Sequence, residues 1–397
     1  MFNTSINTFV QQLRVSILLI LMFLLTACGG GGGGGGGGPL TGYFQDSPVS
    51  GLNYSCSPSG EAATTGTGGA FIYEAGDTCT FSLGAVILGS TTAGAIITPV
   101  ELVSGGTPSH PTVINIVQLL TTADDNGNLS DGINIPPAAS TAAETATVII
   151  ASPDFDTEVV QLVNEMFAAS SGTTGATLTD ATAAQDHMLA TASCVYSGTY
   201  MGTFTTSSGD GEWGVVIFPD LSAIAAAGDN DGYGDYTGSF DPLTNMFSLT
   251  GTWTDDSVVP PITTGDSATG SLTSPQTVVG TTFDGVSFTG SRLGGSSTAI
   301  HRYTGYYIGD ATGVFSIDVD VAGVVTGRSV SFEDGSIGIL GGNVYGADNE
   351  ILNIVQSEGM AVMATIDLVA GTITGGTWSD INSADTGTFS GSGCQLN

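Results

Sequence analysis

The sequence predicts a mainly β protein that ends in an antiparallel meander β-barrel. Alternating apolar and polar residues mark short strands, most clearly at 315–321, and glycine-containing turns such as Ala322-Gly323 and Asp334-Gly335 separate them. Glycine fills 60 of 397 positions, which suits many tight turns. Short strands joined in chain order by tight turns close into meander barrels, so residues 194–397 are predicted to form one.

The barrel region contains an internal repeat. Three phrases occur twice, in the pairs 200–202 and 307–309, 251–253 and 376–378, and 288–291 and 389–392. The interval between the second and third phrases is longer in the first copy, and we predict that the excess forms a surface loop within the Pro-rich stretch 255–282. The pattern leaves open whether the two copies form one barrel or two.

The residues before the barrel divide into four further segments. We predict a signal peptide at 1–27, a lipidated cysteine with a poly-glycine tether at 28–40, a small β-sandwich at 41–107 and a helical connector at 108–193. In the connector, the apolar spacing predicts one helix from Pro111, a second after Ser152-Pro153-Asp154 and a third over 180–192.

The N-terminus has the pattern of an export signal. An apolar run at 16–25, too short to cross a bilayer, ends in small residues. The sequence Leu25-Thr26-Ala27-Cys28 resembles the lipobox of bacterial lipoproteins, which implies cleavage before Cys28, acylation (palmitate) of that cysteine and a membrane anchor. Gly29 is not the aspartate that retains such proteins in the inner membrane, so the resemblance implies the outer membrane, at its periplasmic or cell-surface face.

Four cysteines remain after Cys28. An even number in an exported chain favours disulfides, and three pairings are conceivable. The position of each cysteine favours Cys56 with Cys79 inside the sandwich and Cys194 with Cys394 across the barrel region, where the second bridge would lock the first and last strands together.

Composition excludes one class of partner. The chain carries four arginines, no lysine and 37 acidic residues, a net charge of −33, so it lacks the cations that bind nucleic acid. The same shortage argues against docking on anionic lipid through basic patches, which leaves the lipid anchor as the link to the membrane.

Two resemblances concern the folded regions. Phrases at 46–52, 67–73 and 80–84 resemble the carboxypeptidase-regulatory-like (transthyretin-like) β-sandwich, which implies a spacer or binding module. The Gly-aromatic phrases of the barrel region are similar to the meander barrels of surface lipoproteins, including transferrin-binding-type receptors. The whole chain resembles bacterial outer-membrane surface lipoproteins, a resemblance that implies no particular activity.

An acidic turn is the strongest candidate for a metal site. Asp229, Asp231 and Asp235 surround a Gly turn, and closely spaced carboxylates suit Ca²⁺. The spacing differs from an EF-hand and is similar to the phrase of thrombospondin-type repeats. The alternative is a solvated acidic turn, because Asp, Asn and Gly are favoured in turns anyway. A second, weaker Ca²⁺ candidate covers residues 124–131.

One further segment gathers aromatic and basic side chains. Residues 301–307 place His301 and Arg302 beside three tyrosines, a combination that could bind a carboxylate or a sugar. The alternative, which the pattern favours, is the start of a strand whose tyrosines pack in the barrel.

Catalysis finds little support in the sequence. The three histidines lack metal-protease spacing, and no Gly-x-Ser-x-Gly elbow occurs at a strand–helix turn. We therefore predict a non-catalytic outer-membrane lipoprotein for adhesion or ligand capture, with a small molecule, glycan or protein as its ligand. The alternatives are a structural envelope lipoprotein and a carboxylate-based hydrolase acting on polysaccharide.

Overall fold

The computed structural model describes residues 38–171, 177–207, 209–282, 284–294, 299–320, 322–331, 337–345, 350–356, 360–368, 370–380 and 382–396. They fall into two compact units, an N-terminal unit that ends at Ala192 and a barrel unit that begins at Ser193. The predicted signal peptide, Cys28 and almost all of the glycine tether lie outside the described residues. None of the described helices is long and apolar enough to cross a bilayer.

The N-terminal unit contains two small sheets and one isolated strand pair. One sheet has the strand order β5-β1-β8, the other β4-β3-β6-β7, and β2 pairs with β9. The strands are β1 (Leu40–Phe44), β2 (Val49–Ser50), β3 (Asn53–Ser57), β4 (Ala62–Thr64), β5 (Ala70–Tyr73), β6 (Thr78–Leu83), β7 (Val86–Thr92), β8 (Ile96–Ile97) and β9 (Ile133–Asn134). The predicted Cys56–Cys79 disulfide is confirmed and joins the paired strands β3 and β6.

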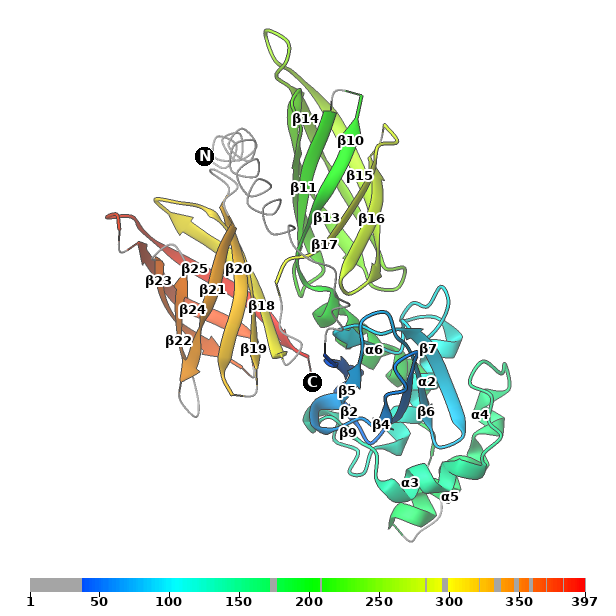
Figure 1. Cartoon of the computed structure of the whole chain (residues 1–397). Helices are drawn as coiled ribbons and strands as arrows, with labels where there is room; N and C mark the ends of the chain where they lie inside the picture. The colour runs from blue at the N-terminus through cyan, green and yellow to red at the C-terminus, as the bar shows by residue number, and fades with distance from the viewer. Residues whose placement is uncertain are drawn as a thin grey trace, which may run out of the picture. The chain divides into compact units, whose positions relative to one another are not determined.

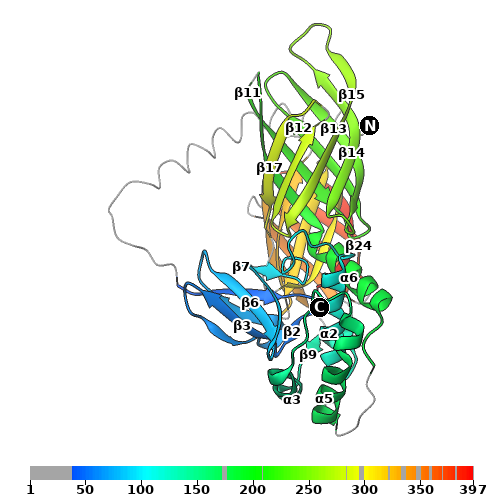
Figure 2. The ribbon, with the colours of Figure 1, turned by 90° about the vertical axis from the view of Figure 1, so that its right-hand side faces the viewer.

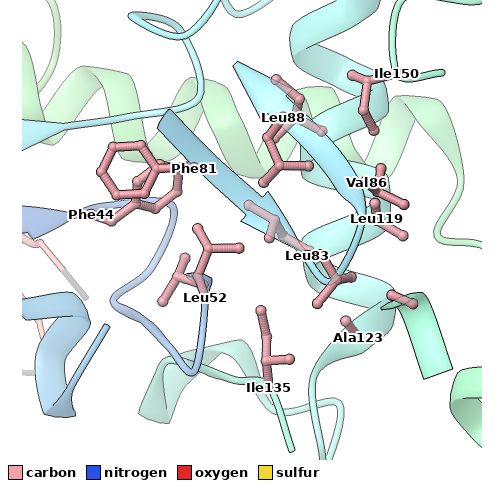
Figure 3. Packing of buried hydrophobic residues seen from close by; sticks show 14 of the residues in the cluster. Phe44, Leu52, Phe81, Leu83, Val86, Leu88, Leu119, Ala123, Ile135 and Ile150 are labelled. Carbon is pink, nitrogen blue, oxygen red and sulfur yellow. The ribbon is translucent and has the colours of Figure 1, made fainter. Parts of the chain in front are cut away.

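The predicted connector helices belong to the same core as these sheets. The helices are α2 (Pro111–Ala123), α3 (Pro137–Ala142), α4 (Phe155–Glu158), α5 (Val160–Ser171) and α6 (Ala181–Tyr196). Leu119 of α2 packs in one cluster with Leu83 of β6 and Val86 of β7, as Figure 3 shows. Residue 107 is therefore not a boundary between two units, because neither layer could bury its apolar face without the other.

The barrel unit contains two closed barrels of eight antiparallel strands each (Figure 1). The first consists of β10 (Gly198–Thr206), β11 (Gly209–Ile217), β12 (Ser222–Gly228), β13 (Gly232–Asp241), β14 (Met246–Asp255), β15 (Ile262–Ser274), β16 (Thr277–Thr282) and β17 (Ser287–Arg292). The second consists of β18 (Ala299–Gly309), β19 (Gly313–Asp320), β20 (Val324–Ser331), β21 (Ile337–Tyr345), β22 (Glu350–Gln356), β23 (Met360–Asp367), β24 (Thr372–Asp380) and β25 (Thr386–Gln395).

Each barrel closes on itself. β10 pairs with β17, and β18 pairs with β25, both antiparallel. The question left open by the repeat is thereby answered: each copy forms its own barrel. The mainly β fold class with a meander barrel is confirmed.

The predicted surface loop at 255–282 is wrong. Most of this stretch forms β15 and β16, and β15 pairs with β14 over ten residues of each strand, as Figure 2 shows for their long hairpin. The prediction failed because the residues of β15 are mostly Thr, Ser and Gly. Such a sequence lacks the alternation of apolar and polar side chains by which a strand is recognised.

Glycines make room for the aromatic rings inside the first barrel. A Cβ atom at Gly270 would lie 2.2 Å from the Phe247 ring on the paired strand, and one at Gly280 would lie 2.2 Å from the Phe288 ring. Each ring therefore lies across a neighbouring strand at a position that has no side chain. This packing explains the frequent Gly-aromatic phrases of the sequence.

The C-terminal end of α6 joins the two barrels. The predicted disulfide between Cys194 and Cys394 is confirmed, but Cys194 lies in the last turn of α6 rather than beside a first strand. The bridge therefore ties the helix end that precedes β10, the first strand of the region, to β25, the last strand, which belongs to the second barrel. The third predicted helix continues four residues beyond its expected end at 192.

Two arginines bind the same helix end. Arg292 of β17 and Arg302 of β18 both donate to the carbonyl oxygen of Val195, at 2.8 and 2.9 Å. Cations are favoured at this end because the last carbonyls of a helix carry partial negative charge. Arg292 also donates to the Ser197 carbonyl, and burial together with the charge of Arg302 lowers its pKa to about 10.

Candidate functional site

A cavity occupies one end of the first barrel, and we call it the mouth cavity. Its volume is about 520 Å³. It lies at the end where β10 meets β11, β12 meets β13, β14 meets β15 and β16 meets β17, since residues next to all four connections line it. The lining side chains include six aromatic residues, namely Phe204, Trp213, Tyr236, Phe247, Trp253 and Phe288.

The mouth cavity holds one acidic side chain within its barrel wall. Asp266 belongs to β15, and the Tyr236 hydroxyl donates to its Oδ2 atom over 2.6 Å. The backbone N–H of Ser267 donates to Oδ1 over 2.7 Å. Four further aspartates line the cavity beside the strand connections, at positions 229, 231, 255 and 284. No Lys, Arg or His is among the lining residues in the part of the chain that the structure describes.

The register of three strands brings Asp266 and Tyr236 together. Tyr236 pairs with Gly251 of β14, and Gly251 pairs with Asp266 of β15. Because the residue between them has no side chain, the tyrosine can reach across β14 to the carboxylate. Burial and the nearby Asp266 charge raise the pKa of Tyr236, so its hydroxyl stays protonated and acts as the donor at neutral pH.

The three aspartates predicted to bind Ca²⁺ do not converge. Asp229 Oδ1 accepts the backbone N–H groups of Asp231 and Gly232, at 2.9 and 3.1 Å, so this carboxylate stabilises its own turn. Asp229 and Asp231 line the mouth cavity, whereas Asp235 does not. Side chains alternate along a strand, and Tyr236 faces the interior, so its neighbour Asp235 faces outward.

The second Ca²⁺ candidate is likewise a hydrogen-bonded turn. Asp124 Oδ1 accepts the backbone N–H of Asn134, and Asp131 Oδ2 accepts the side-chain amide of Asn126. Over the described ranges, no three His, Cys, Asp or Glu side chains form a group that could hold a metal ion. At both places the described carboxylates accept hydrogen bonds within or beside their own turns, and the calcium sites stay predictions.

Asp235 lies on the outer face of the first barrel. Tyr233, two residues before it on the same face, packs against an apolar cluster of the two barrels, in which Phe218, the residue after β11, lies with Val314 of β19. Burial raises the pKa of Asp235 to about 6, and its Oδ1 atom is buried without a hydrogen-bond partner. The charged form of this carboxyl is therefore unfavourable in the folded protein.

We expect Asp235→Asn to stabilise the protein more at pH 7.5 than at pH 4.5. The pKa of this carboxyl is raised from the ordinary 3.8 to about 6 in the folded protein, so the loss of stability is absent below about pH 3.8, grows between pH 3.8 and 6 and is complete above pH 6. The carboxyl partly reaches solvent, so we expect about 1 kcal/mol, or a rise of about 2–4 °C in the unfolding midpoint.

Thermal unfolding at the two pH values tests this prediction, with Asp284→Asn as the control for loss of one exposed negative charge. An equal effect of Asp235→Asn at both pH values would contradict it.

The segment 301–307 is a strand start, as the favoured alternative predicts. Tyr303 is fully buried inside the second barrel, and Arg302 is 1% exposed. The guanidinium of Arg302 forms a bidentate ion pair with Asp318: Nε donates to Oδ1 over 2.8 Å, and Nη2 donates to Oδ2 over 3.0 Å. The guanidinium of Arg302 is therefore engaged inside the protein and does not face a ligand at the surface.

Sequence reasoning missed the residues that line the mouth cavity. Asp266 lies in the stretch that we predicted to be a loop, and Tyr236 lies one residue from a predicted metal ligand. One signal was available. Asp266, Ala268 and Gly270 are alternate residues and therefore share one face of the strand, and a carboxylate beside two small residues is unusual there. That signal requires the strand to be recognised first.

The fold defines a double-barrel protein with a ligand-sized cavity in the first barrel. No protein-family model and no curated protein matches the sequence. Among solved structures, the chain is similar to the crystal structure of a double mutant of the vaccine antigen transferrin-binding protein B from Haemophilus parasuis. The identity is 8%, the match covers 50% of this chain and 76% of that chain, and the TM-score is 0.18. The resemblances at 46–84 and at Cys28 stay predictions.

Proposed function

We propose that this protein is a non-catalytic, lipid-anchored binding protein that captures a small ligand in the mouth cavity. The cavity itself carries the proposal. Small-molecule sites are typically concave, about 300–1,000 Å³ in volume and mostly apolar, with a few polar groups that orient the ligand. The mouth cavity has such a volume, about 520 Å³, with six aromatic side chains and with polar groups that include Asp266 and four further aspartates.

Two further observations support a place outside the cytoplasm. Two disulfides close in the described part of the chain, and such bonds persist in oxidising compartments. The apolar run before Cys28 supports export and an acyl anchor at the outer membrane. The poly-glycine tether would let the binding unit move relative to the membrane surface while remaining attached to it.

Filling the mouth cavity tests the proposal. We expect wild-type protein to bind the neutral apolar dye N-phenyl-1-naphthylamine with one site and increased dye fluorescence. Ala227 lines the cavity, so Ala227→Trp should weaken binding at least about tenfold by occupying the space of the dye. Thr252→Trp places the same side chain at an exposed position of β14 and should leave binding unchanged.

The two variants also report on folding. Both should retain the wild-type far-UV circular dichroism, so a loss of binding in Ala227→Trp reflects the filled cavity. Absence of dye binding in the wild type, or equal binding by Ala227→Trp, would overturn capture in this cavity.

A further inference from the structure

The mouth cavity combines an inward carboxylate with an aromatic wall, and we propose that its ligand is an organic cation: an ammonium group carried on an apolar body. The inference rests on the proposed function and names the class of ligand. Asp266 would pair with the ammonium group, and the aromatic side chains would contact the apolar body.

The position of Asp266 is the first argument. On β15 the residues from Ile262 to Gly265 are exposed and Asp266 is half-buried. Ala268, two residues further along the same face, is buried and pairs with Thr282, the last residue of β16. Asp266 therefore lies where the strand enters the barrel wall, and a hydrogen bond between two charged groups is stronger in such a partly desolvated place than at an open surface.

The two donors to Asp266 prepare it for a cation. Tyr236 and the N–H of Ser267 each donate to a different oxygen of the Asp266 carboxylate. Each oxygen can accept a second hydrogen bond, so an ammonium donor can be added without displacing either group. The Tyr236 bond also holds the carboxylate in one orientation, which reduces the entropy lost on binding.

The aromatic wall is the second argument. Trp253 pairs with Thr264 of β15, two residues before Asp266, and lines the cavity with Trp213 and Phe288. The face of an aromatic ring attracts a cation, with Trp the strongest, and rings beside a carboxylate are the usual surroundings of bound ammonium groups. A neutral apolar ligand would use the rings but would leave Asp266 buried beneath it without a counter-ion.

The distribution of positive charge is the third argument. The described residues contain three arginines and no lysine. Arg292 and Arg302 are buried and bind the end of α6, and Arg328 belongs to the second barrel. None of the three lines the mouth cavity, so its five aspartates have no basic side chain among the lining residues. Their combined field attracts cations and repels anions.

Three compounds with one apolar body test the inference. 4-Phenylbutylammonium, 4-phenylbutanol and 5-phenylpentanoate share a phenylbutyl body and differ in the polar group and its charge. Isothermal titration calorimetry would measure binding of each to the wild type, and fluorescence would localise it, since Trp213 and Trp253, two of the three tryptophans, line the cavity. We expect the ammonium compound to bind about tenfold to a hundredfold more tightly than the alcohol, and the carboxylate most weakly.

Asp266→Asn should remove the preference for the cation and leave the affinity for the alcohol within about threefold of wild type. Asp220→Asn removes an exposed charge at the connection of β11 and β12, outside the mouth cavity, and should change cation affinity by less than about threefold, with an effect that disappears at high salt. Retained binding of the alcohol shows that Asp266→Asn is folded.

The outcomes separate the two proposals. If the alcohol binds as tightly as the ammonium compound, or if Asp266→Asn keeps the preference, the organic-cation inference is overturned and ligand capture stands. If none of the three compounds binds the wild type at millimolar concentration and the dye also fails to bind, ligand capture in the mouth cavity is overturned as well.

Discussion

The Cys194→Ser/Cys394→Ser variant should unfold about 10–20 °C below the wild type. The bridge closes a loop with a sequence separation of 200 residues. In the chain-entropy model, a cross-link of this span stabilises the folded state by about 5 kcal/mol, since it restricts the unfolded chain. A unit of this size shifts its midpoint by about 2–4 °C per kcal/mol.

Differential scanning calorimetry of the oxidised proteins measures this shift. The Cys56→Ser/Cys79→Ser variant is the matched control, because its bridge spans 23 residues and should contribute about 3 kcal/mol to the N-terminal unit. A barrel transition that stays at the wild-type temperature in Cys194→Ser/Cys394→Ser would contradict the prediction.

Arg302→Leu should cost about 3–5 kcal/mol of stability, because it leaves the Asp318 carboxylate, 2% exposed, without its guanidinium. The carbonyl oxygens of Cys194 and Val195 also lose a donor. Arg302→Leu/Asp318→Leu removes both charges and should be more stable than the single variant, since burying a lone charge costs more than burying none.

Urea unfolding of the single and double variants measures both values. Arg328→Leu is the control, since Arg328 is half-buried and its described hydrogen bond goes to the carbonyl of its neighbour Gly327. We expect a change below about 1 kcal/mol for it. A double variant no more stable than Arg302→Leu would show that the lost carbonyl contacts, rather than the unpaired charge, dominate.

The barrel class could be predicted because its inward aromatic residues and its turns leave a local pattern. The internal repeat was detected, but its register was wrong. Gly202 pairs with Gly290 in the first barrel and Gly305 with Gly391 in the second, so Tyr200 corresponds to Tyr303 rather than to Tyr307. Similar Gly-aromatic sequences recur within each barrel, because aromatic rings pack against glycines of neighbouring strands. Local sequence similarity alone therefore does not identify the equivalent strand.

The disulfide pairings could be predicted from position, but the role of Cys194 could not. α6 extends through Cys194 because the barrel unit supplies donors for its last carbonyls, and those donors are arginines about 100 or more residues further along the chain. The mouth cavity was missed for the same reason. Asp266, Gly251 and Tyr236 meet through strand register, a long-range property that composition and spacing do not contain.

The position of Cys194 ahead of both barrels has a consequence for biosynthesis. An N-terminal export signal brings the chain into the oxidising compartment from its N-terminal end, so Cys194 arrives there before Cys394. The first barrel needs no strand beyond Arg292 to close, and Cys56 and Cys79 are already paired neighbours by then. If oxidation follows the order of arrival, Cys56 and Cys79 are already joined when Cys194 arrives, and Cys194 stays reduced until Cys394 of the last strand arrives. The direction of export would then select one of three pairings, and the second bridge would close only after β25 has arrived.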